Sequence, residues 1–206
     1  MNKTRIAVLV SGGGTNLQAL LDAQKSGALH SGEIVLVVSN RPDAYALERA
    51  RREGIEALTV TKKDCGGQEA FEATLLGALE VRGIELIVLA GFLSILSADF
   101  TRRYEKRILN VHPSLIPSFC GKGFYGLKVH EAALAYGVKV TGATVHYVNE
   151  IPDGGQILLQ KAVPILPGDT PERLQKRVME QAEWILLPEA AELVSSRIQQ
   201  EKEHRQ

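Results

Sequence analysis

Short apolar runs alternate along this chain with longer segments whose apolar residues recur three or four positions apart. Residues 5–10 are an apolar run that predicts a strand, and residues 15–25 carry leucines at helical spacing. The same alternation predicts further strands at 33–40, 56–60, 85–92 and 107–112, with helices at 43–53 and 68–82. Strands that alternate with helices indicate right-handed crossovers and a parallel sheet covered by helices on both faces.

The pattern changes after residue 137. Residues 138–148 and 156–165 alternate apolar and polar positions with a period of two, and a polar turn separates them. They predict an antiparallel or mixed edge added to the parallel sheet. A long helix is predicted over 170–200, and Pro188 inside it predicts a kink or a break. With no repeat and no linker-like stretch, we expect residues 1–206 to form a single α/β domain.

The composition narrows the classes of function. Apolar residues make up 45% of the chain, enough for a full core, and 24 basic residues balance 24 acidic ones. A neutral chain argues against a general nucleic-acid binder, which usually carries a basic excess. The first apolar run is far shorter than a membrane span, and two distant cysteines indicate reduced thiols. We expect a cytoplasmic protein that binds neither nucleic acid nor membrane.

A glycine-rich turn, SGGGTN at 11–16, joins the first predicted strand to the first predicted helix. Glycines let the backbone approach a ligand closely, and a helix start offers unpaired N–H groups with a favourable dipole. The turn therefore favours a phosphate site. A tight turn in which Ser11 or Thr15 caps the helix accounts for the same residues equally well.

Two familiar nucleotide-binding motifs do not fit this turn. No Lys-Ser or Lys-Thr pair follows the glycines, which argues against a nucleoside-triphosphate loop and against ATP as a cofactor. Leu17 stands where a dinucleotide fingerprint requires its third glycine, and the second strand ends in Ser39-Asn40 and not in an acidic residue. A dinucleotide oxidoreductase is therefore disfavoured.

Asn110 and His112 lie two residues apart on the strand predicted at 107–112, so they share one face of that strand. Asp153 follows in the turn between the last two predicted strands. Acyl transfer to an amine uses such groups, because an amide N–H or an imidazolium stabilises the developing oxyanion and an imidazolium protonates the leaving nitrogen. A carboxylate beside the histidine favours its charged form. No serine or cysteine is paired with a base, which favours direct transfer over a covalent intermediate.

Each of these residues also has a structural explanation. A histidine on a strand more often serves packing than catalysis, and an aspartate before two glycines is most often a turn residue. His112, His130 and His146 lack the compact spacing of a metal site, and no cysteine pair joins them, so we predict no metal. From the residues alone, the chain is an α/β protein suited to phosphate binding and acyl transfer.

Several separated motifs, in matching order, resemble the folate-dependent formyltransferases over nearly the whole chain. They are RIAVLVSGGGTNLQALLDA near the start, NVHPSLIPSF with its following Gly121, GATVHYVN and DGGQILLQ. The resemblance implies a Rossmann-like fold with a mostly parallel sheet. The site residues that it implies are catalytic Asn110, His112 and Asp153, and phosphate-binding Gly14, Thr15 and Asn16.

The resemblance assigns further residues to the two substrates. Glu183 matches a carboxylate that binds the acceptor, which the SGGGTNLQAL form of the turn identifies as glycinamide ribonucleotide. His130, expected to open a helix, matches a histidine near the site. Gln68 stands where relatives often carry arginine, and the loop after Gly121 is longer than in compact relatives. The residues implied to bind the folate donor are Gln68, Leu93, Ser94, Ile95, Leu96, Asn110 and Asn149.

An enzyme that moves the formyl group of 10-formyltetrahydrofolate to an amine is implied, with no metal, no ATP and no tightly bound cofactor. Its partners would be small molecules, and the chain would be a monomer or a homodimer. Relatives that formylate methionyl-tRNA or a sugar nucleotide, or hydrolyse the donor, stay open as alternatives, as does a non-catalytic protein that binds a phosphorylated ligand. The enzyme that formylates methionyl-tRNA carries a further C-terminal domain, and the hydrolase carries a further N-terminal domain. We expect this chain to have neither, and we therefore expect its acceptor to be a small phosphorylated amine.

Overall fold

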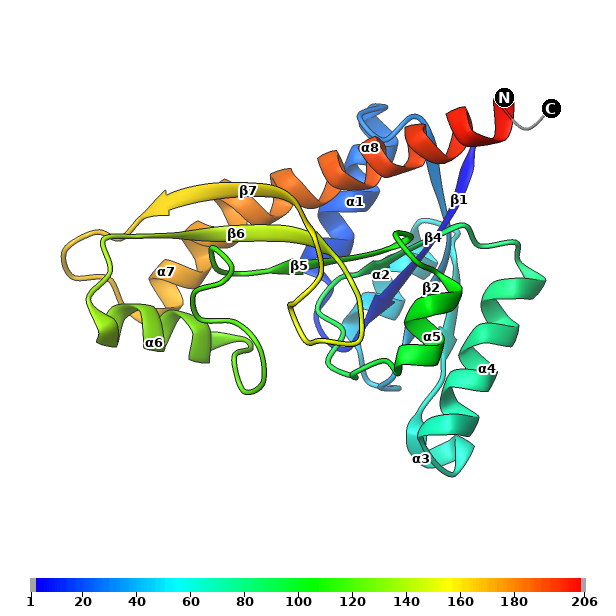
Figure 1. Cartoon of the computed structure of the whole chain (residues 1–206), viewed down its shortest axis with the longest axis horizontal. Helices are drawn as coiled ribbons and strands as arrows, with labels where there is room; N and C mark the ends of the chain where they lie inside the picture. Colours follow the sequence, from blue (N-terminus) through cyan, green and yellow to red (C-terminus); the bar gives the residue numbers. More distant parts are fainter. Residues whose placement is uncertain (1–2, 205–206) are drawn as a thin grey trace.

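A seven-stranded sheet in the order β3-β2-β1-β4-β5-β6-β7 forms the centre of the computed structural model, which describes residues 3–204 (Figure 1). The strands are β1 Thr4–Val10, β2 Gly32–Ser39, β3 Glu56–Thr59, β4 Leu86–Leu89, β5 Ile108–His112, β6 Val140–Tyr147 and β7 Ile157–Pro164. Pairs among β1 to β5 are parallel, whereas β6 pairs antiparallel with both β5 and β7. The predicted Rossmann-like α/β fold, with a mostly parallel sheet and an antiparallel C-terminal edge, is confirmed.

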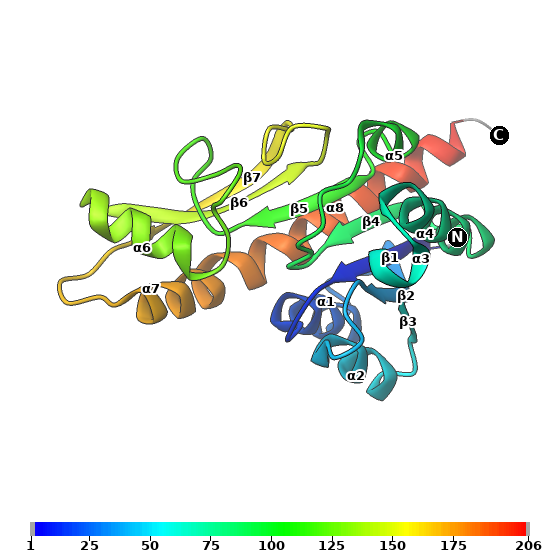
Figure 2. The ribbon, with the colours of Figure 1, turned by 90° about the horizontal axis from the view of Figure 1, so that it is seen from below.

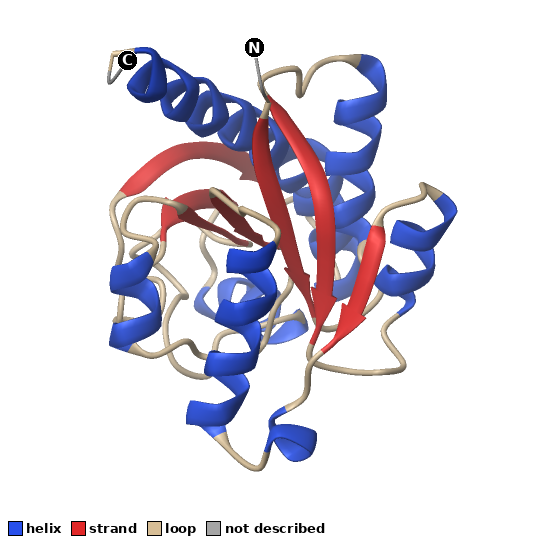
Figure 3. Ribbon diagram, turned by 90° about the vertical axis from the view of Figure 1, so that its right-hand side faces the viewer, coloured by secondary structure: helices blue, strands red, loops and turns tan. Residues whose placement is uncertain are grey.

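Helices lie on both sides of the strands (Figure 3). They are α1 Thr15–Ser26, α2 Tyr45–Arg52, α3 Lys62–Cys65, α4 Gln68–Val81, α5 Ala98–Arg103, α6 Leu127–Tyr136, α7 Pro171–Val178 and α8 Trp184–Glu203. The helices predicted at 15–25, 43–53 and 68–82 are confirmed as α1, α2 and α4. The sequence pattern does not predict α3 and α5, because each is too short to show a helical period. No helix within residues 3–204 is long and apolar enough to cross a membrane.

Alternation along the parallel strands builds a core on each face of the sheet. Ile6, Val8 and Val10 of β1 are fully buried and pack with α1, α2 and α8. Ala7 and Leu9 of the same strand pack with α4 and α5 on the opposite face. Figure 2 shows these two layers, with α1 and α2 on one side of the strands and α4 and α5 on the other. A continuous apolar run therefore marks a strand that is buried on both faces.

The strand order reverses between β1 and β4, because β1 continues to β2 and β3 while β4 continues to β5 and the antiparallel strands. Such a switch point leaves a crevice at the carboxyl ends of the strands. The glycine turn after β1 lies next to the loop over 90–97 after β4, since the Leu93 N–H donates to Ser11 Oγ at 2.9 Å. The fold thus places the two loops predicted to bind the substrates at one edge of the sheet.

The closing helix differs from its prediction near the centre. A π-helical turn, η1 (Met179–Glu183), separates α7 from α8, and α8 continues through Pro188. Of the two predicted outcomes at Pro188, a kink or a break, the break is therefore wrong. A proline lacks an N–H and crowds the carbonyl four residues before it, which for Pro188 is the carbonyl of Trp184. The wider η1 turn ends at the residue just before Trp184. The irregularity lies one turn earlier than predicted.

Helix α6 begins at Leu127 and not at His130, where the sequence places its start. Gly126 precedes the helix with φ 57°, a conformation that favours glycine, and it lets the loop turn into the helix sooner. His130 is consequently an interior helix residue with no exposed surface. The prediction that His130 opens the helix is wrong.

Candidate active site

Asn110, His112 and Asp153 meet at the carboxyl end of β5. Asn110 Nδ2 lies 3.4 Å from Asp153 Oδ1, and His112 Nδ1 lies 3.5 Å from Asp153 Oδ2. β5 supplies the first two residues, and the loop between β6 and β7 supplies the third, with φ 55° at Asp153. The structure therefore brings together the three residues that the sequence singles out, and the alternation of β5 explains why two of them share a face.

His146 is a fourth member of this cluster, and sequence reasoning missed it. The antiparallel register places His146 opposite Asn110, and His146 Nε2 lies 3.1 Å from Asn110 Nδ2 and 3.6 Å from Asp153 Oδ1. His146 Nδ1 donates to the Tyr147 carbonyl at 2.8 Å, and this contact orients Nε2 toward Asn110 and Asp153. The sequence would have indicated His146 if the two predicted strands had been paired, because each carries a polar side chain among apolar ones.

Asp153 holds its negative charge in a half-buried position. Burial alone raises the pKa of the Asp153 carboxyl, but the His146 side chain, the charge of His112 and the Gly121 N–H together bring that pKa below its ordinary value. The Gly121 N–H donates to Asp153 Oδ2 at 2.8 Å, which ties the carboxylate to the loop after β5. The site thus contains a carboxylate that stays ionised beside two imidazoles.

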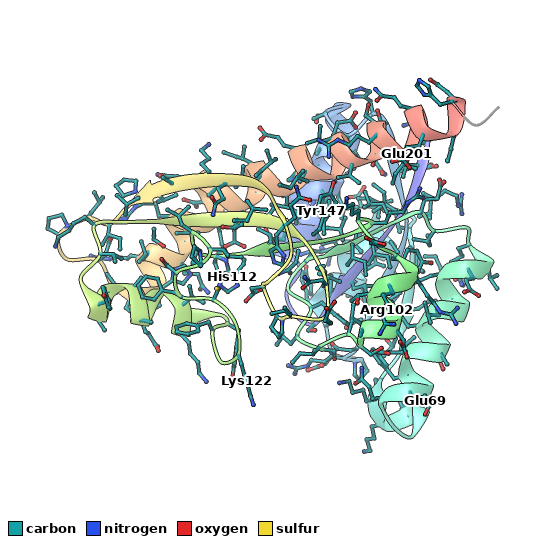
Figure 4. All side chains as sticks on the ribbon, in the orientation of Figure 1. Glu69, Arg102, His112, Lys122, Tyr147 and Glu201 are labelled. Atoms are coloured by element: carbon teal, nitrogen blue, oxygen red, sulfur yellow. The ribbon has the colours of Figure 1, made fainter. Side chains whose placement is uncertain are left out.

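Both ring nitrogens of His112 face protein acceptors. Nε2 donates to the Phe119 carbonyl at 2.9 Å, and Nδ1 faces Asp153. Only 4% of His112 is exposed. In Figure 4, His112 lies between the strands and the loop that carries Lys122, whose side chain projects away from the sheet. An imidazolium can donate at both nitrogens, and this environment offers it an acceptor at each.

A cleft beside the cluster separates the loop after β4 from the loop after β6. It encloses about 510 Å³, part of it open to solvent, and His146 and Asp153 line it. Residues from both loops contribute, including Ile151 from the second one. Of the residues that the resemblance assigns to the folate donor, those that line the cleft are Ser94, Ile95, Leu96, Asn110 and Asn149.

Leu93 and Gln68, also assigned to the donor, do not line this cleft. Leu93 is 62% exposed, next to the residues that do. Gln68 Nε2 donates to the Ile95 carbonyl at 3.1 Å and also to Glu72 Oε1. The structure therefore has Gln68 supporting the backbone of the loop, and a direct contact with folate stays a prediction.

The glycine turn requires glycine at one position. Gly14 has φ 74°, and a Cβ there would lie 2.6 Å from Ala46 Cβ and 2.9 Å from Ala46 Cα. Gly12 and Gly13 are exposed, and no atom lies within 4 Å of the position of a Cβ on either. Gly14 is also the N-cap of α1, so no side chain caps this helix. The capping alternative is thus wrong, and the first N–H groups of α1 suit an anion.

Glu183, the last residue of η1, lies beside the start of α1. Asn16 Nδ2 donates to Glu183 Oε2 at 2.8 Å, and only 6% of Glu183 is exposed. Burial raises the pKa of the Glu183 carboxyl to about 7, although the hydrogen bond from Asn16 acts in the opposite direction. Two residues predicted to bind the acceptor are thus brought together from opposite ends of the chain.

His130 is fully buried on α6, and its ring nitrogens have no hydrogen-bond partner among the described residues. Burial, followed by the charge of His112, lowers the pKa of His130 to about 4. The imidazole is therefore neutral near pH 7. No group of three or more His, Cys, Asp or Glu side chains in the described part of the chain is arranged to hold a metal ion.

Known proteins match this chain over most of its length, and the formyl transferase family matches residues 4–190. The trifunctional purine biosynthetic protein adenosine-3 of Gallus gallus is 46% identical over 195 residues, which are 95% of this chain and 19% of that protein. The chain thus spans about a fifth of the length of this curated relative. The chloroplastic phosphoribosylglycinamide formyltransferase of Arabidopsis thaliana is 37% identical, over 95% of this chain and 67% of that protein.

A solved structure is similar in both fold and sequence. Glycinamide ribonucleotide transformylase 1 of Symbiobacterium toebii matches with a TM-score of 0.88 at 43% identity, covering 94% of this chain and 88% of that chain. The family match covers β1 and the glycine turn that follows it, and it extends past Asp153 into the closing helix. On this agreement of sequence and fold, the chain belongs to the formyl transferase family.

Proposed function

We propose that this protein transfers the formyl group of 10-formyltetrahydrofolate to the amine of glycinamide ribonucleotide, a reaction of purine synthesis. The observation that carries the proposal is the convergence of Asn110, His112 and Asp153 beside a cleft at the carboxyl edge of the sheet. The names of the relatives from Arabidopsis thaliana and Symbiobacterium toebii support the choice of acceptor.

The cleft suits the folate donor. Ile95 and Ile151 line it from the two loops and are 63% and 57% exposed, so apolar surface is available to a ring system. Polar groups at the cleft, including those of Asn110 and Asn149, can fix the orientation of the ring. In this arrangement the formyl group lies next to Asn110, His146 and Asp153, which line the cleft, and His112 lies beside Asp153.

The start of α1 suits the acceptor. The N–H groups of Thr15 and Asn16 follow the Gly14 N-cap, where the helix dipole favours a phosphate. Glu183 beside Asn16 accepts hydrogen bonds from a hydroxyl or an amine of the ribotide. The phosphate at the turn then directs the amine end of the acceptor toward β5.

In the proposed reaction, the acceptor amine attacks the formyl carbon directly. A bond forms between this carbon and the acceptor nitrogen, and the bond between the carbon and the folate nitrogen breaks. His112 gives a proton to the leaving folate nitrogen and then takes up the proton that the amine loses, so the imidazolium is restored and the overall proton balance is zero. Negative charge builds up on the formyl oxygen during this exchange, and its stabilisation is usually the largest contribution to such catalysis.

Asn110 and the His112 imidazolium donate hydrogen bonds to that oxygen, and His112 also protonates the leaving nitrogen. Each residue has a contact to Asp153 that is longer than a typical hydrogen bond, at 3.4 and 3.5 Å, and can exchange it for the substrate. Asp153 keeps its negative charge next to His112 Nδ1 and so compensates the positive charge that His112 carries as a donor. No covalent intermediate is required.

The test is to incubate the purified protein with glycinamide ribonucleotide and 10-formyltetrahydrofolate, following folate absorbance and the mass of the product. We expect formylglycinamide ribonucleotide and tetrahydrofolate, without added metal or ATP. His112→Ala protein, prepared in the same way, controls for contaminating activity. Absence of the formylated product with folded wild-type protein contradicts the proposal.

Other acceptors within the family give different products in the same assay. Formylation of methionyl-tRNA or of a sugar nucleotide at a comparable rate would replace the proposed acceptor, and release of formate without an acceptor would indicate a hydrolase. A protein that only binds its ligands would give no product at all. The single domain, the cytoplasmic location and the monomeric or dimeric state stay predictions.

A further inference from the structure

Glu72 on α4 is a buried carboxylate outside the catalytic cluster. Only 7% of the residue is exposed, and its neighbour Phe71 belongs to the core on the face of the sheet that α4 and α5 cover. Glu72 Oε1 accepts from the Ser97 N–H at 2.7 Å and from Gln68 Nε2, and Oε2 accepts from the Ser97 hydroxyl. A buried carboxylate is costly unless it is hydrogen-bonded, and these three donors offset the cost.

The hydrogen bonds of Glu72 end on the loop that connects β4 to α5. Ser97 is the N-cap of α5, because its Oγ accepts from the Phe100 N–H at 3.2 Å. Gln68, whose amide is held by Glu72, donates to the Ile95 carbonyl at 3.1 Å. Glu72 therefore fixes the loop directly at Ser97 and indirectly, through Gln68, at Ile95.

The first part of the loop is held by the residues that directly follow β1 and β2. Ser11 Oγ accepts from the Leu93 N–H at 2.9 Å, and Asn40 Nδ2 donates to Ser94 Oγ at 2.7 Å. Although the loop is held on two sides, the side chains of Leu93 and Ile95 stay largely exposed. A fixed backbone with exposed apolar side chains is a preorganised surface for a flat ligand.

We propose that Glu72 is a positioning residue that sets the affinity for the ring system of the formyl donor, by fixing the backbone of residues 95–97. The inference rests on the proposed function, which assigns this loop to the donor. Glu72 does not line the cleft, so it acts through Ser97 and Gln68. Because the acceptor residues lie at the start of α1 and on η1, Glu72 affects binding of the donor and neither binding of the acceptor nor formyl transfer.

The experiment compares Glu72→Gln with Glu69→Gln, an exposed residue of the same helix that is labelled in Figure 4. Glutamine keeps the size of the side chain but removes the charged acceptor and places an N–H opposite the Ser97 donors. We expect the KM for 10-formyltetrahydrofolate and the Kd for tetrahydrofolate, measured by calorimetry, to rise about 10-fold in Glu72→Gln. The KM for the ribotide and kcat should change less than about twofold, and Glu69→Gln should match the wild type.

Ser97→Ala tests the same connection from the other side. It should raise the KM for the donor in the same way, and the double variant with Glu72→Gln should be less than additive. If Glu72→Gln does not fold, Ser97→Ala provides the same comparison. An unchanged donor KM and Kd, or an equal rise in the KM for the ribotide, would overturn the inference in favour of a purely structural role.

The calorimetric arm separates this inference from the proposed function. If the wild type forms no formylated product but binds tetrahydrofolate, the proposed reaction fails while the comparison of Kd values still decides the role of Glu72. If the wild type is active and the Glu72→Gln protein keeps the wild-type Kd, the inference fails alone.

Discussion

Glu183 accepts a 2.8 Å hydrogen bond from the Asn16 side chain, although 167 positions separate the two residues along the chain. The contact joins η1 to the first turn of α1, next to the proposed phosphate site. Burial brings the pKa of Glu183 to about 7, so its charge changes close to neutral pH. The stability of this junction therefore depends on pH.

Glu183→Gln should remove a pH dependence from the stability of the protein. The folded protein keeps a proton on Glu183 that the unfolded chain releases above its ordinary pKa of 4.5. The contribution of this bound proton to the free energy of unfolding is complete below pH 4.5 and is lost as the pH rises through 7. Relative to the variant, the wild type should lose roughly 2 kcal/mol between pH 5 and 8, measured by urea unfolding. Parallel stability curves for the two proteins contradict the prediction.

Asn110→Ala and His112→Ala should each lower turnover about 100- to 1,000-fold, because each removes one donor to the developing oxyanion. The KM values for both substrates should change little, since the lost interactions are strongest in the transition state. Steady-state kinetics on purified proteins measures this. Because His112 and Asp153 act as a unit, His112→Ala combined with Asp153→Asn should be little worse than His112→Ala alone. Near-normal turnover in His112→Ala, or strictly additive losses, contradict the mechanism.

Asp153→Asn should change the pH profile and not only the rate. The pKa of Asp153 lies below its ordinary value of 3.8, so the wild-type residue is ionised throughout an assay from pH 5 to 9. Asparagine removes this charge from beside His112, and turnover at neutral pH should fall about 10- to 100-fold. Activity should recover partly as the pH is lowered and the imidazolium becomes more populated. A pH–rate profile of the same shape as the wild-type profile argues against this role for Asp153.

Two variants of the glycine turn should behave differently. Gly14→Ala forces a Cβ into the Ala46 backbone at a positive φ, so it should destabilise the protein by about 1–3 kcal/mol as well as weaken ribotide binding. Gly13→Ala places its methyl group in open space and should leave the melting temperature unchanged. It should still raise the KM for the ribotide, because the methyl group occupies the approach to the phosphate site. A rise in the KM for the donor instead means that the turn is misassigned.

The parallel half of the fold could be predicted because its signals are local. The runs at 5–10 and 33–40 are short and apolar, and each is followed by a helical period, which fixes both element types. The short α5 gives no such signal, and its start depends on one capping contact at Ser97. The wide turn η1 could not be predicted either, because its sequence, MEQAE, is compatible with an ordinary helix.

The site could be predicted only in part for a related reason. Asn110 and His112 share a face by the period of one strand, which a sequence displays. His146 enters the site through the register of β6 on β5, a relation between distant segments that no local pattern encodes. Glu183 looks like a solvated helix residue in the sequence, and only the resemblance to the family assigned it to the acceptor. Its burial against Asn16 is a result of the tertiary fold.

The wide turn η1 sets the rotational phase between the two halves of the closing helix. α7 packs against α6 and β6, whereas α8 packs against α1 and runs across the sheet, in contact with strands from β2 to β7. An α-helix rotates by about 100° per residue, so each residue added to or removed from this turn would rotate one packing face by that amount relative to the other. The five residues of η1 thus act as an angular spacer, and a change in their number should disrupt the packing of α7 or of α8.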